Sequence, residues 1–184
     1  IALEAGLLAA NIAPGSFRHF FSFMKWRGYD KDLWMSLKEE AEKGITNPGR
    51  IIKASDINPL SIGSIRKNIE SAGLQKIIKI EIDDFFKSSG DKNEPPMLIM
   101  NPPYGERVKN EDPQNFFKQI GDTLKNNYAG STAWIIAPPE EMIRNIGLKP
   151  HRKIILYNGQ IECRFARFDL FKGSQKEHKT QKNT

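Results

Sequence analysis

The feature that most constrains the fold of this sequence is an alternation between short apolar runs and longer amphipathic segments. Runs of strand length are RIIKAS (50–55), KIIKIEI (76–82), MLIM (97–100) and TAWIIA (132–137). Most of the segments between them carry apolar residues at helical spacing. Strand and helix repeated in this way, with right-handed crossovers, predict a mostly parallel sheet that helices cover on both faces.

Capping residues indicate where the helices begin. Asn58 and Pro59 open a helix that closes near Gly73, while Asp112 caps a helix that ends at Gly130. A short helix is expected over residues 140–146. The apolar residues expected to face inward on the two longer helices are Ile62, Ile65, Ile69, Phe116, Phe117, Ile120 and Leu124. Residues 152–171 are typical of two strands joined at Asn158-Gly159, so an antiparallel hairpin strand is predicted at one edge of the sheet.

The N-terminal part differs in character. Residues 1–12 are almost wholly apolar and predict a buried helix that stops at Pro14-Gly15. An aromatic cluster, RHFFSFMKW, follows, and then a helix capped by Asp30 or Asp32 that ends at Gly44. This pattern predicts a helical insertion over about residues 15–46. The aromatic cluster suits either a base-stacking surface or packing of the insertion onto the domain, and packing is favoured.

Composition adds limits on domain number and setting. The chain has 184 residues, 39% of them hydrophobic, which suits one domain over residues 1–171. Residues 172–184 hold four lysines and one glutamate, so they supply three of the six net positive charges and predict a basic disordered tail. The charge alone therefore argues weakly for a nucleic-acid partner.

Cysteine and histidine usage bears on compartment and metal binding. A single cysteine, Cys163, excludes an internal disulfide, and no run is long enough to cross a bilayer, so a cytoplasmic protein is expected. The three histidines and one cysteine lack metal-ligand spacing, and no metal site is predicted. The chain starts at Ile1 without a methionine or a signal peptide, and we expect it to begin inside a longer protein.

Polar groups follow three of the predicted strands. Asp56 follows the run at 50–55, Asp83 and Asp84 follow the run at 76–82, and Asn101 follows MLIM. Ligands of open parallel sheets bind beyond the carboxyl ends of the strands. In dinucleotide-binding sheets an acid at the end of the second strand accepts from ribose hydroxyls, and Asp56 suits this role. Asp83 or Asp84, at the end of the next strand, suits an adenine amine. A turn or cap role is the alternative for each acid.

The turn after MLIM suits a planar base that carries an amino group. Asn101 offers a side-chain carbonyl, Pro102 a backbone carbonyl and Tyr104 an aromatic face. Two carbonyls that accept the N–H groups of an amine favour a pyramidal nitrogen, whose lone pair can point at an electrophilic methyl group. A proline-stiffened turn without chemistry is the alternative.

These residues carry a family resemblance. The NPPY stretch is similar to the signature of Rossmann-like amino-methyltransferases that use S-adenosylmethionine. NPPYGER, with ALEAGLLAANIAPG, KWRGYDKDLW and SDINPLSIGSIRKNIESAGL, resembles the methyltransferase domain of bacterial enzymes that make N2-methylguanosine in 23S ribosomal RNA. The resemblance runs from near Ile1 to about Phe171 and implies a class I methyltransferase sheet.

The resemblance also implies roles for single residues. The expected lining of the target amine is Asn101, Pro102, Pro103 and Tyr104, and the expected cofactor contacts are Asp56, Ile57, Asp83 or Asp84, Phe85 and Asn101. Relatives have a first strand and a glycine-rich loop before this point, and an RNA-binding THUMP domain upstream. We therefore expect the fold to be N-terminally truncated here. The alternatives are an N6-adenine methyltransferase acting on RNA or DNA, and an RNA-binding scaffold without catalysis.

Overall fold

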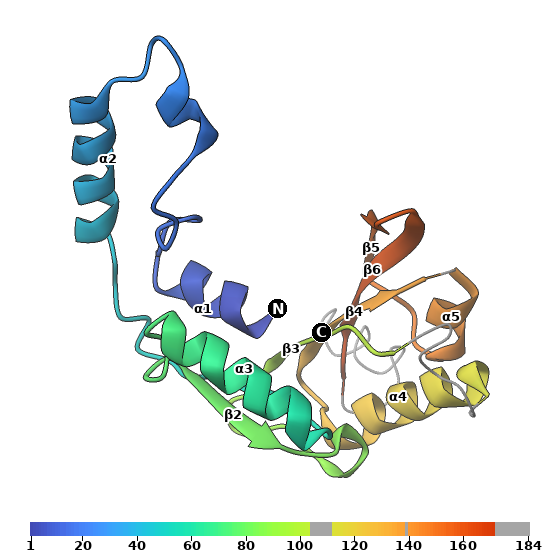
Figure 1. Cartoon of the computed structure of the whole chain (residues 1–184). Coiled ribbons are helices and arrows are strands. Elements are labelled where there is room, and N and C mark those ends of the chain that lie inside the picture. The colour runs from blue at the N-terminus through green and yellow to red at the C-terminus, as the bar shows by residue number, and fades with distance from the viewer. Residues whose placement is uncertain (104–111, 139, 172–184) are drawn as a thin grey trace, which may run out of the picture. The chain divides into compact units, whose positions relative to one another are not determined.

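The computed structural model describes residues 1–103, 112–138 and 140–171 (Figure 1). The chain divides into two compact units, unit 1 at Ile1–Asp84 and unit 2 at Phe85–Thr184. The elements of unit 1 are α1 (Ala2–Ala9), η1 (Ser22–Lys25), α2 (Lys31–Lys43), β1 (Ile52–Asp56), α3 (Pro59–Ser71) and β2 (Ile78–Ile82). Those of unit 2 are η2 (Phe85–Lys87), β3 (Met97–Met100), α4 (Pro113–Asn127), β4 (Thr132–Ala137), α5 (Glu140–Asn145), β5 (Arg152–Asn158) and β6 (Ile161–Asp169).

Unit 1 is built on a parallel pair of strands with one apolar face. β1 and β2 run side by side with Ile52 opposite Ile78 and Asp56 opposite Ile82. Because side chains alternate between the faces of a strand, the apolar residues of IKASD and IKIEI share one side. There they pack with α1 and α3 around Ile69, Leu74 and Ile78. The strand pair is thus covered on one face by α1 and α3.

The outer face of this pair is polar. Lys53 and Lys79 lie opposite each other in the register, and the Lys79 ammonium lies 2.6 Å from the Glu81 carboxylate. The hydrogen bond from Lys79, then its charge and that of Lys53, lower the pKa of Glu81 below its usual range. Charged side chains therefore occupy the face that the helices of unit 1 leave open.

Local signals in the sequence explain how the helices of unit 1 are held. The Asn58 side chain accepts a hydrogen bond from the Leu60 N–H at 2.9 Å, and Pro59 takes the first turn, so α3 begins as predicted. Gly6 lets α1 approach β2 closely, since a Cβ built there would lie 2.6 Å from the Ile78 side chain. α1 therefore needs a residue without a side chain at this position.

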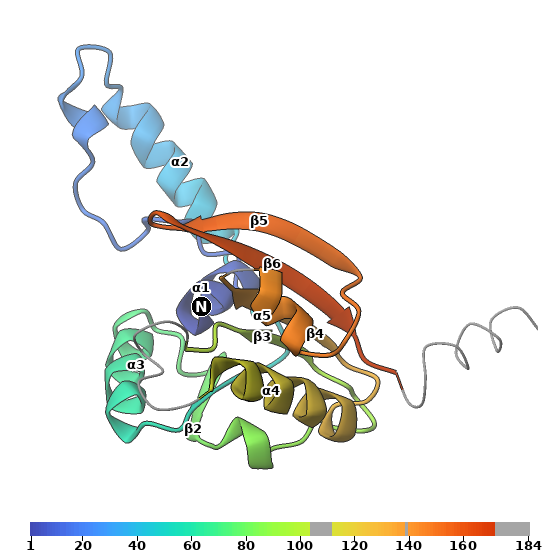
Figure 2. The same ribbon diagram turned by 90° about the vertical axis from the view of Figure 1, so that its right-hand side faces the viewer.

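The predicted insertion forms an arm, residues 15–46, that extends from the helix and strand layer of unit 1 (Figures 1 and 2). Its foot is fixed by two hydrogen bonds: the Asn11 side chain donates to the Gly44 carbonyl at 2.8 Å, and the Thr46 N–H donates to the Ala10 carbonyl at 2.9 Å. Asp30 caps α2 by accepting from two backbone N–H groups. The arm is thus held by hydrogen bonds at its foot and at the start of α2.

The aromatic residues of the arm contact one another. Phe21 and Phe23 stack at 5.3 Å between ring centroids, and both form T-shaped pairs with Trp34 on α2, at 5.5 and 5.0 Å. Packing of this cluster onto the domain was the favoured prediction. Among the described residues, every ring contact of the arm's aromatic residues lies within the arm. The rings therefore contact one another and not the rings of the sheet. The physical reason is that Trp34 on α2 packs against Phe21 and Phe23 and completes a small cluster within the arm.

Unit 2 holds a four-stranded sheet in the order β3-β4-β6-β5. β3 and β4 are parallel, and β6 is antiparallel to both β4 and β5. The predicted hairpin is confirmed, with Asn158 opposite Ile161 and Gly159 in the left-handed region at φ +64°. β6 is the internal antiparallel strand and β5 is the edge (Figure 2).

The core of unit 2 lies between the sheet and helices α4 and α5. Phe117 and Leu124 of α4 are fully buried against strand residues such as Ile135 and Phe168. α4 and α5 approach so closely that a Cβ on Gly121 would lie 1.8 Å from the Ile146 carbonyl oxygen. The capped helix predicted from Asp112 and Pro113 is therefore the main cover of this sheet.

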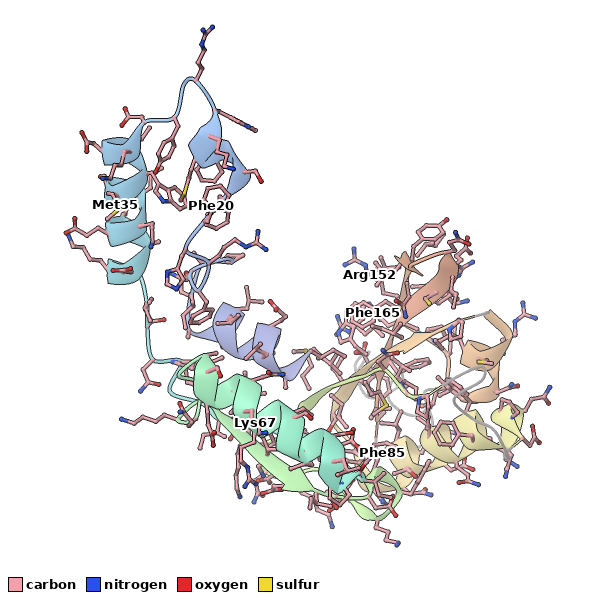
Figure 3. All side chains as sticks on the ribbon, viewed as in Figure 1. Phe20, Met35, Lys67, Phe85, Arg152 and Phe165 are labelled. Atoms are coloured by element: carbon pink, nitrogen blue, oxygen red, sulfur yellow. The ribbon has the colours of Figure 1, made fainter. Side chains whose placement is uncertain are left out.

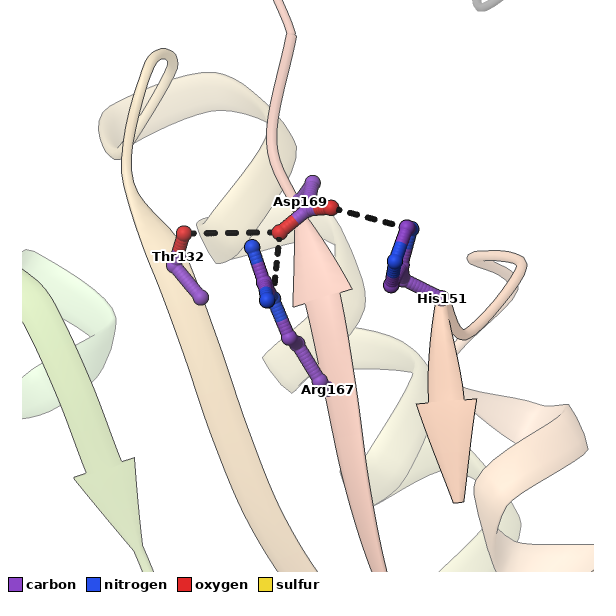
Figure 4. A network of polar contacts seen from close by, with 4 residues as sticks. All are labelled: Thr132, His151, Arg167 and Asp169. Atoms are coloured by element: carbon purple, nitrogen blue, oxygen red, sulfur yellow. Dashed lines mark hydrogen bonds and ion pairs between the residues drawn. The ribbon is translucent and has the colours of Figure 1, made fainter.

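A polar network joins strands at the other end of this sheet, away from the carboxyl ends of β3 and β4 (Figure 4). Asp169 accepts a hydrogen bond from Arg167 at 2.8 Å and another from the Thr132 hydroxyl at 3.4 Å. The imidazole of His151 lies 3.3 Å from its second oxygen. The network ties β4, β6 and the start of β5 together.

The α/β class, the parallel pairs and the antiparallel hairpin are confirmed. Cover on both faces is not observed within either unit, where the described helices pack on one face. Among the described residues, β1 pairs with one strand, β2, and β3 pairs with one strand, β4. The predictions of a single domain over 1–171 and of a preceding strand and glycine loop stay predictions. The predicted tail at 172–184 lies outside the described residues.

Candidate functional site

In unit 1 the structure brings Asp56 and Asp83 to one edge of the sheet. Asp56 is the last residue of β1, and the Asp83 N–H donates to the Asp56 carbonyl at 3.3 Å just after β2 ends. The spacing of the two acids in the sequence predicted this neighbourhood. Both strands run in the same direction, so their carboxyl ends meet here.

Asp56 also organises the turn into α3. One carboxylate oxygen accepts from the Asn58 N–H at 2.8 Å, and the Asn58 side chain in turn caps α3. Among the hydrogen bonds of the described residues, none engages the second oxygen of Asp56. Ile57 beside it is 67% exposed. Asp56 is thus half-buried and oriented, with one oxygen left for a ligand.

Asn58 is the residue that the sequence did not connect with this edge. Its N–H fixes the Asp56 carboxylate, while its side chain starts the next helix. The sequence Asp56-Ile57-Asn58-Pro59 contained the signal. Short polar side chains such as Asp and Asn accept hydrogen bonds from the backbone N–H two residues ahead.

The second acidic position holds Asp83 and Asp84, followed by Phe85. The exposed Asp83 carboxylate accepts from the Asp84 N–H at 2.9 Å, whereas Asp84 is half-buried. In unit 2 the ring of Phe85 stacks on Tyr128 with 5.7 Å between centroids. The Phe85 side chain is therefore engaged in core packing, and its carbonyl accepts from the Ser88 N–H at 3.3 Å and from the Ser88 hydroxyl at 2.8 Å. Only its backbone N–H is left for contact with a ligand.

In unit 2 the turn after β3 carries the predicted amine-binding residues. Asn101 follows Met100 directly and is exposed, Pro102 is buried and Pro103 is exposed. A buried proline next to an exposed asparagine holds the backbone while it leaves the amide accessible. Tyr104 lies outside the described residues, so its predicted stacking role has no structural description.

The donor set at these positions suits an adenosine and an amine more than a metal ion. Among the described residues, no group of three or more His, Cys, Asp or Glu side chains is placed to hold a metal. In the same part of the chain, no helix is long and apolar enough to cross a membrane. Carboxylates that accept from hydroxyl and amino groups, and amide carbonyls that accept from an amine, are what the strand ends offer.

Comparison with known proteins identifies the family. The model of the RMKL-like methyltransferase domain matches residues 1–167. The chain belongs to this family. The ribosomal RNA large subunit methyltransferase K/L of Methylococcus capsulatus is 36% identical over 176 residues, which cover 91% of this chain and 23% of that protein. The chain spans about a quarter of the length of the curated relatives it matches.

Two solved structures share the fold. A possible methylase from Clostridium difficile 630 superposes with a TM-score of 0.81 at 30% identity, covering 94% of this chain and 46% of that one. SMU.472, named as a methyltransferase and solved in complex with SAH, gives a TM-score of 0.80 at 25% identity with the same coverage. The Rossmann-like methyltransferase fold implied by the sequence motifs is therefore confirmed.

Proposed function

We propose that the protein carrying this chain transfers a methyl group from S-adenosylmethionine to the exocyclic N2 of a guanine in large-subunit ribosomal RNA. The observation that carries the proposal is the Asn101-Pro102-Pro103 turn at the carboxyl end of β3 in a member of the RMKL-like methyltransferase family. The relatives named as large-subunit ribosomal RNA methyltransferases support the RNA substrate. The proposal includes an RNA-binding THUMP domain elsewhere in the protein and a cytoplasmic setting, as the sequence resemblance implies.

The amine is oriented by the turn after β3. The Asn101 side-chain carbonyl and the Pro102 backbone carbonyl accept the two N–H groups of the guanine amine, which draws its lone pair out of conjugation with the ring. Pro102 and Pro103 fix the backbone, so the two acceptors keep their spacing. Because methyl transfer requires an in-line approach, a stiff turn contributes directly to the rate.

The acids of unit 1 fit the nucleoside part of the cofactor. S-adenosylmethionine supplies the electrophilic methyl group when bound. In this proposal the second oxygen of Asp56 accepts from ribose hydroxyls, and Asp83 or Asp84 accepts from the adenine amine. Phe85, which follows Asp84 in the chain, offers its backbone N–H. Exposed Ile57 offers apolar surface next to the ribose.

The decisive experiment is methyl transfer to unmodified ribosomal RNA followed by nucleoside analysis. N2-methylguanosine is the expected product. Asn101→Ala should lower turnover on the order of a hundredfold with little change in cofactor affinity, because its carbonyl acts mainly in the transition state. Asn68→Ala, on the exposed side of α3, is the matched control and should leave turnover unchanged.

Other outcomes would contradict the proposal in distinct ways. N6-methyladenosine as the product would show that the protein is an N6-adenine methyltransferase. RNA binding without methyl transfer would show that it is a non-catalytic RNA-binding scaffold. If Asn101→Ala changed turnover less than a few-fold, the catalytic role of the turn would be refuted.

The role of Asp56 can be separated from its turn. Asp56→Asn keeps an oxygen for the Asn58 N–H but removes the charge and an acceptor, so S-adenosylmethionine affinity should fall about tenfold, or about 1.4 kcal/mol, with folding stability retained. Asp91→Asn is the matched control, since Asp91 accepts from the Asn93 N–H in the same geometry at 2.8 Å. Equal calorimetric affinities for wild type and Asp56→Asn would reduce Asp56 to a turn residue.

A further inference from the structure

The arm carries a segment that the proposed catalysis does not use. Residues 16–29, the aromatic segment, hold six aromatic side chains and three cations, Arg18, Lys25 and Arg27, with no acidic residue. Helix α2, which returns along the arm, holds four acids and three lysines. Positive charge and aromatic rings therefore coincide on the outgoing segment.

The cluster inside the arm accounts for only part of these rings. Phe21 and Phe23 are half-buried against Trp34, and Tyr29 lies 6.0 Å from Phe23. Three other rings remain open to solvent: Phe17 is 53% exposed, Phe20 51% and Trp26 71%. Exposed aromatic rings grouped on one segment mark an interaction surface, because a solitary fold gains nothing from leaving them in water.

The cations lie beside the rings. The Lys25 ammonium is 5.3 Å from the centre of the Phe20 ring, and the Arg18 guanidinium is 5.3 Å from that of Phe21. Arg27 follows Trp26 directly and is exposed. In the part of the chain that the structure describes, no carboxylate pairs with Arg18, Lys25 or Arg27. Their charge is available to an anionic partner.

The segment is also held in place. Gly15 enters it at φ +81°, with the Phe21 ring 2.9 Å from where a Cβ would stand, and the foot of the arm is fixed by hydrogen bonds from Asn11 and Thr46. Figure 3 marks Phe20 on this segment and Met35 on α2. Because the rings and cations are already held in position, binding loses less conformational entropy than it would with a disordered segment.

We propose that the aromatic segment binds an unpaired stretch of the RNA substrate, with Phe20 and Trp26 stacking on bases and Lys25 and Arg27 contacting phosphates. Stacking on exposed rings requires bases whose faces are free, which selects single-stranded RNA over a duplex. The uncompensated cations favour a phosphate backbone over an apolar protein surface. The inference rests on the proposed function, since it names how the substrate of that reaction is held.

The test measures binding of a labelled single-stranded RNA dodecamer to the purified protein by fluorescence anisotropy. Phe20→Ala with Trp26→Ala should raise Kd at least tenfold, whereas Trp26→Phe alone should stay near wild type. The matched control is Leu33→Ala with Met35→Ala, which removes two exposed apolar side chains from α2 and should leave Kd unchanged.

A second pair of variants needs no change in any ring. Lys25→Glu with Arg27→Glu should weaken binding and lower the slope of log Kd against log salt by about 1.4, at about 0.7 for each lost phosphate contact of a single strand. Circular dichroism checks that α2 stays folded in each variant. Unchanged Kd in both arm variants, or an equal loss in the α2 control, would overturn the assignment. An equal loss for single-stranded and duplex RNA would overturn the choice of single strands.

The result is distinguishable from failure of the catalytic proposal. If both arm variants bind RNA as the wild type does and methyl transfer persists, only the proposal that the aromatic segment binds RNA is refuted. Loss of RNA binding in the arm variants supports the arm whether or not a methylated nucleoside is formed, because anisotropy does not depend on turnover.

Discussion

Unit 2 and unit 1 use the same alternation of strand and helix but bury different amounts of apolar surface. Among the described residues, the core of unit 2 joins twelve buried residues on or just after α4, β4, α5 and β6, whereas that of unit 1 centres on Ile69, Leu74 and Ile78. The turn proposed to orient the amine thus follows a strand of the more deeply buried unit, and the acids proposed for the cofactor follow strands of the less buried one. Reacting groups need fixed spacing, whereas a cofactor that must come and go tolerates a softer site.

The largest expected effect is in the core of unit 2. Phe117→Ala should lower the free energy of unfolding by about 3–5 kcal/mol, because the ring is fully buried and leaves a cavity. Leu74→Ala in unit 1 should cost about 2 kcal/mol, since most of the apolar residues packed around it are only partly buried and can move into the gap. Urea unfolding with hydrogen exchange measures both. A larger loss for Leu74→Ala would reverse the comparison.

A smaller effect comes from close helix contact. Gly121→Ala should cost about 3 kcal/mol, since its Cβ would meet the Ile146 carbonyl and force α4 from α5. Gly63→Ala in α3 is the control: nothing lies within 4 Å of its Cβ, so the variant should gain about 0.5–1 kcal/mol from helix propensity. Thermal unfolding of the two variants should move in opposite directions. Destabilisation of both variants would contradict the open space beside Gly63 and show that α3 is tightly packed at this position.

The smallest effect is electrostatic and should be alike in the two units. Lys79 lowers the pKa of Glu81, and Arg164, with help from Tyr157, lowers the pKa of Glu162. A depressed carboxyl pKa stabilises the fold above the unfolded pKa, and this contribution is lost as pH falls through the folded pKa. Glu81→Gln and Glu162→Gln should therefore each slightly flatten the acid side of a stability profile measured from about pH 3 to pH 6. Steeper profiles in either variant would contradict the sign.

Much of the fold could be predicted because the signals are local. The strands at 97–100 and 132–137 match the sequence runs, and Asn58, Asp30 and Asp112 cap the helices they precede. Such features depend on side chains within a few residues of one another. The neighbourhood of Asp56 and Asp83 was also predictable, since parallel pairing places strand ends together.

What could not be predicted depends on partners distant in sequence. The ring of Phe85 packs on Tyr128, and the rings of the arm close on Trp34 instead of on the sheet. Apolar spacing shows that a residue is buried but not against what. The turn role of Asp56 was weighed only as a general alternative, because one carboxylate can serve a turn and a ligand at once.

The foot of the arm has a consequence for how such proteins diversify. The hydrogen bond from Asn11 to Gly44 spans 33 positions of the chain, so the backbone leaves the helix and strand layer of unit 1 and returns to it at nearly the same point. The entropy of closing a loop grows only with the logarithm of its length. An insert with adjoining ends can therefore be lengthened, shortened or exchanged at little cost to the sheet. Selection can therefore exchange the proposed RNA-binding surface in one event, without disturbing the strands proposed to carry the chemistry.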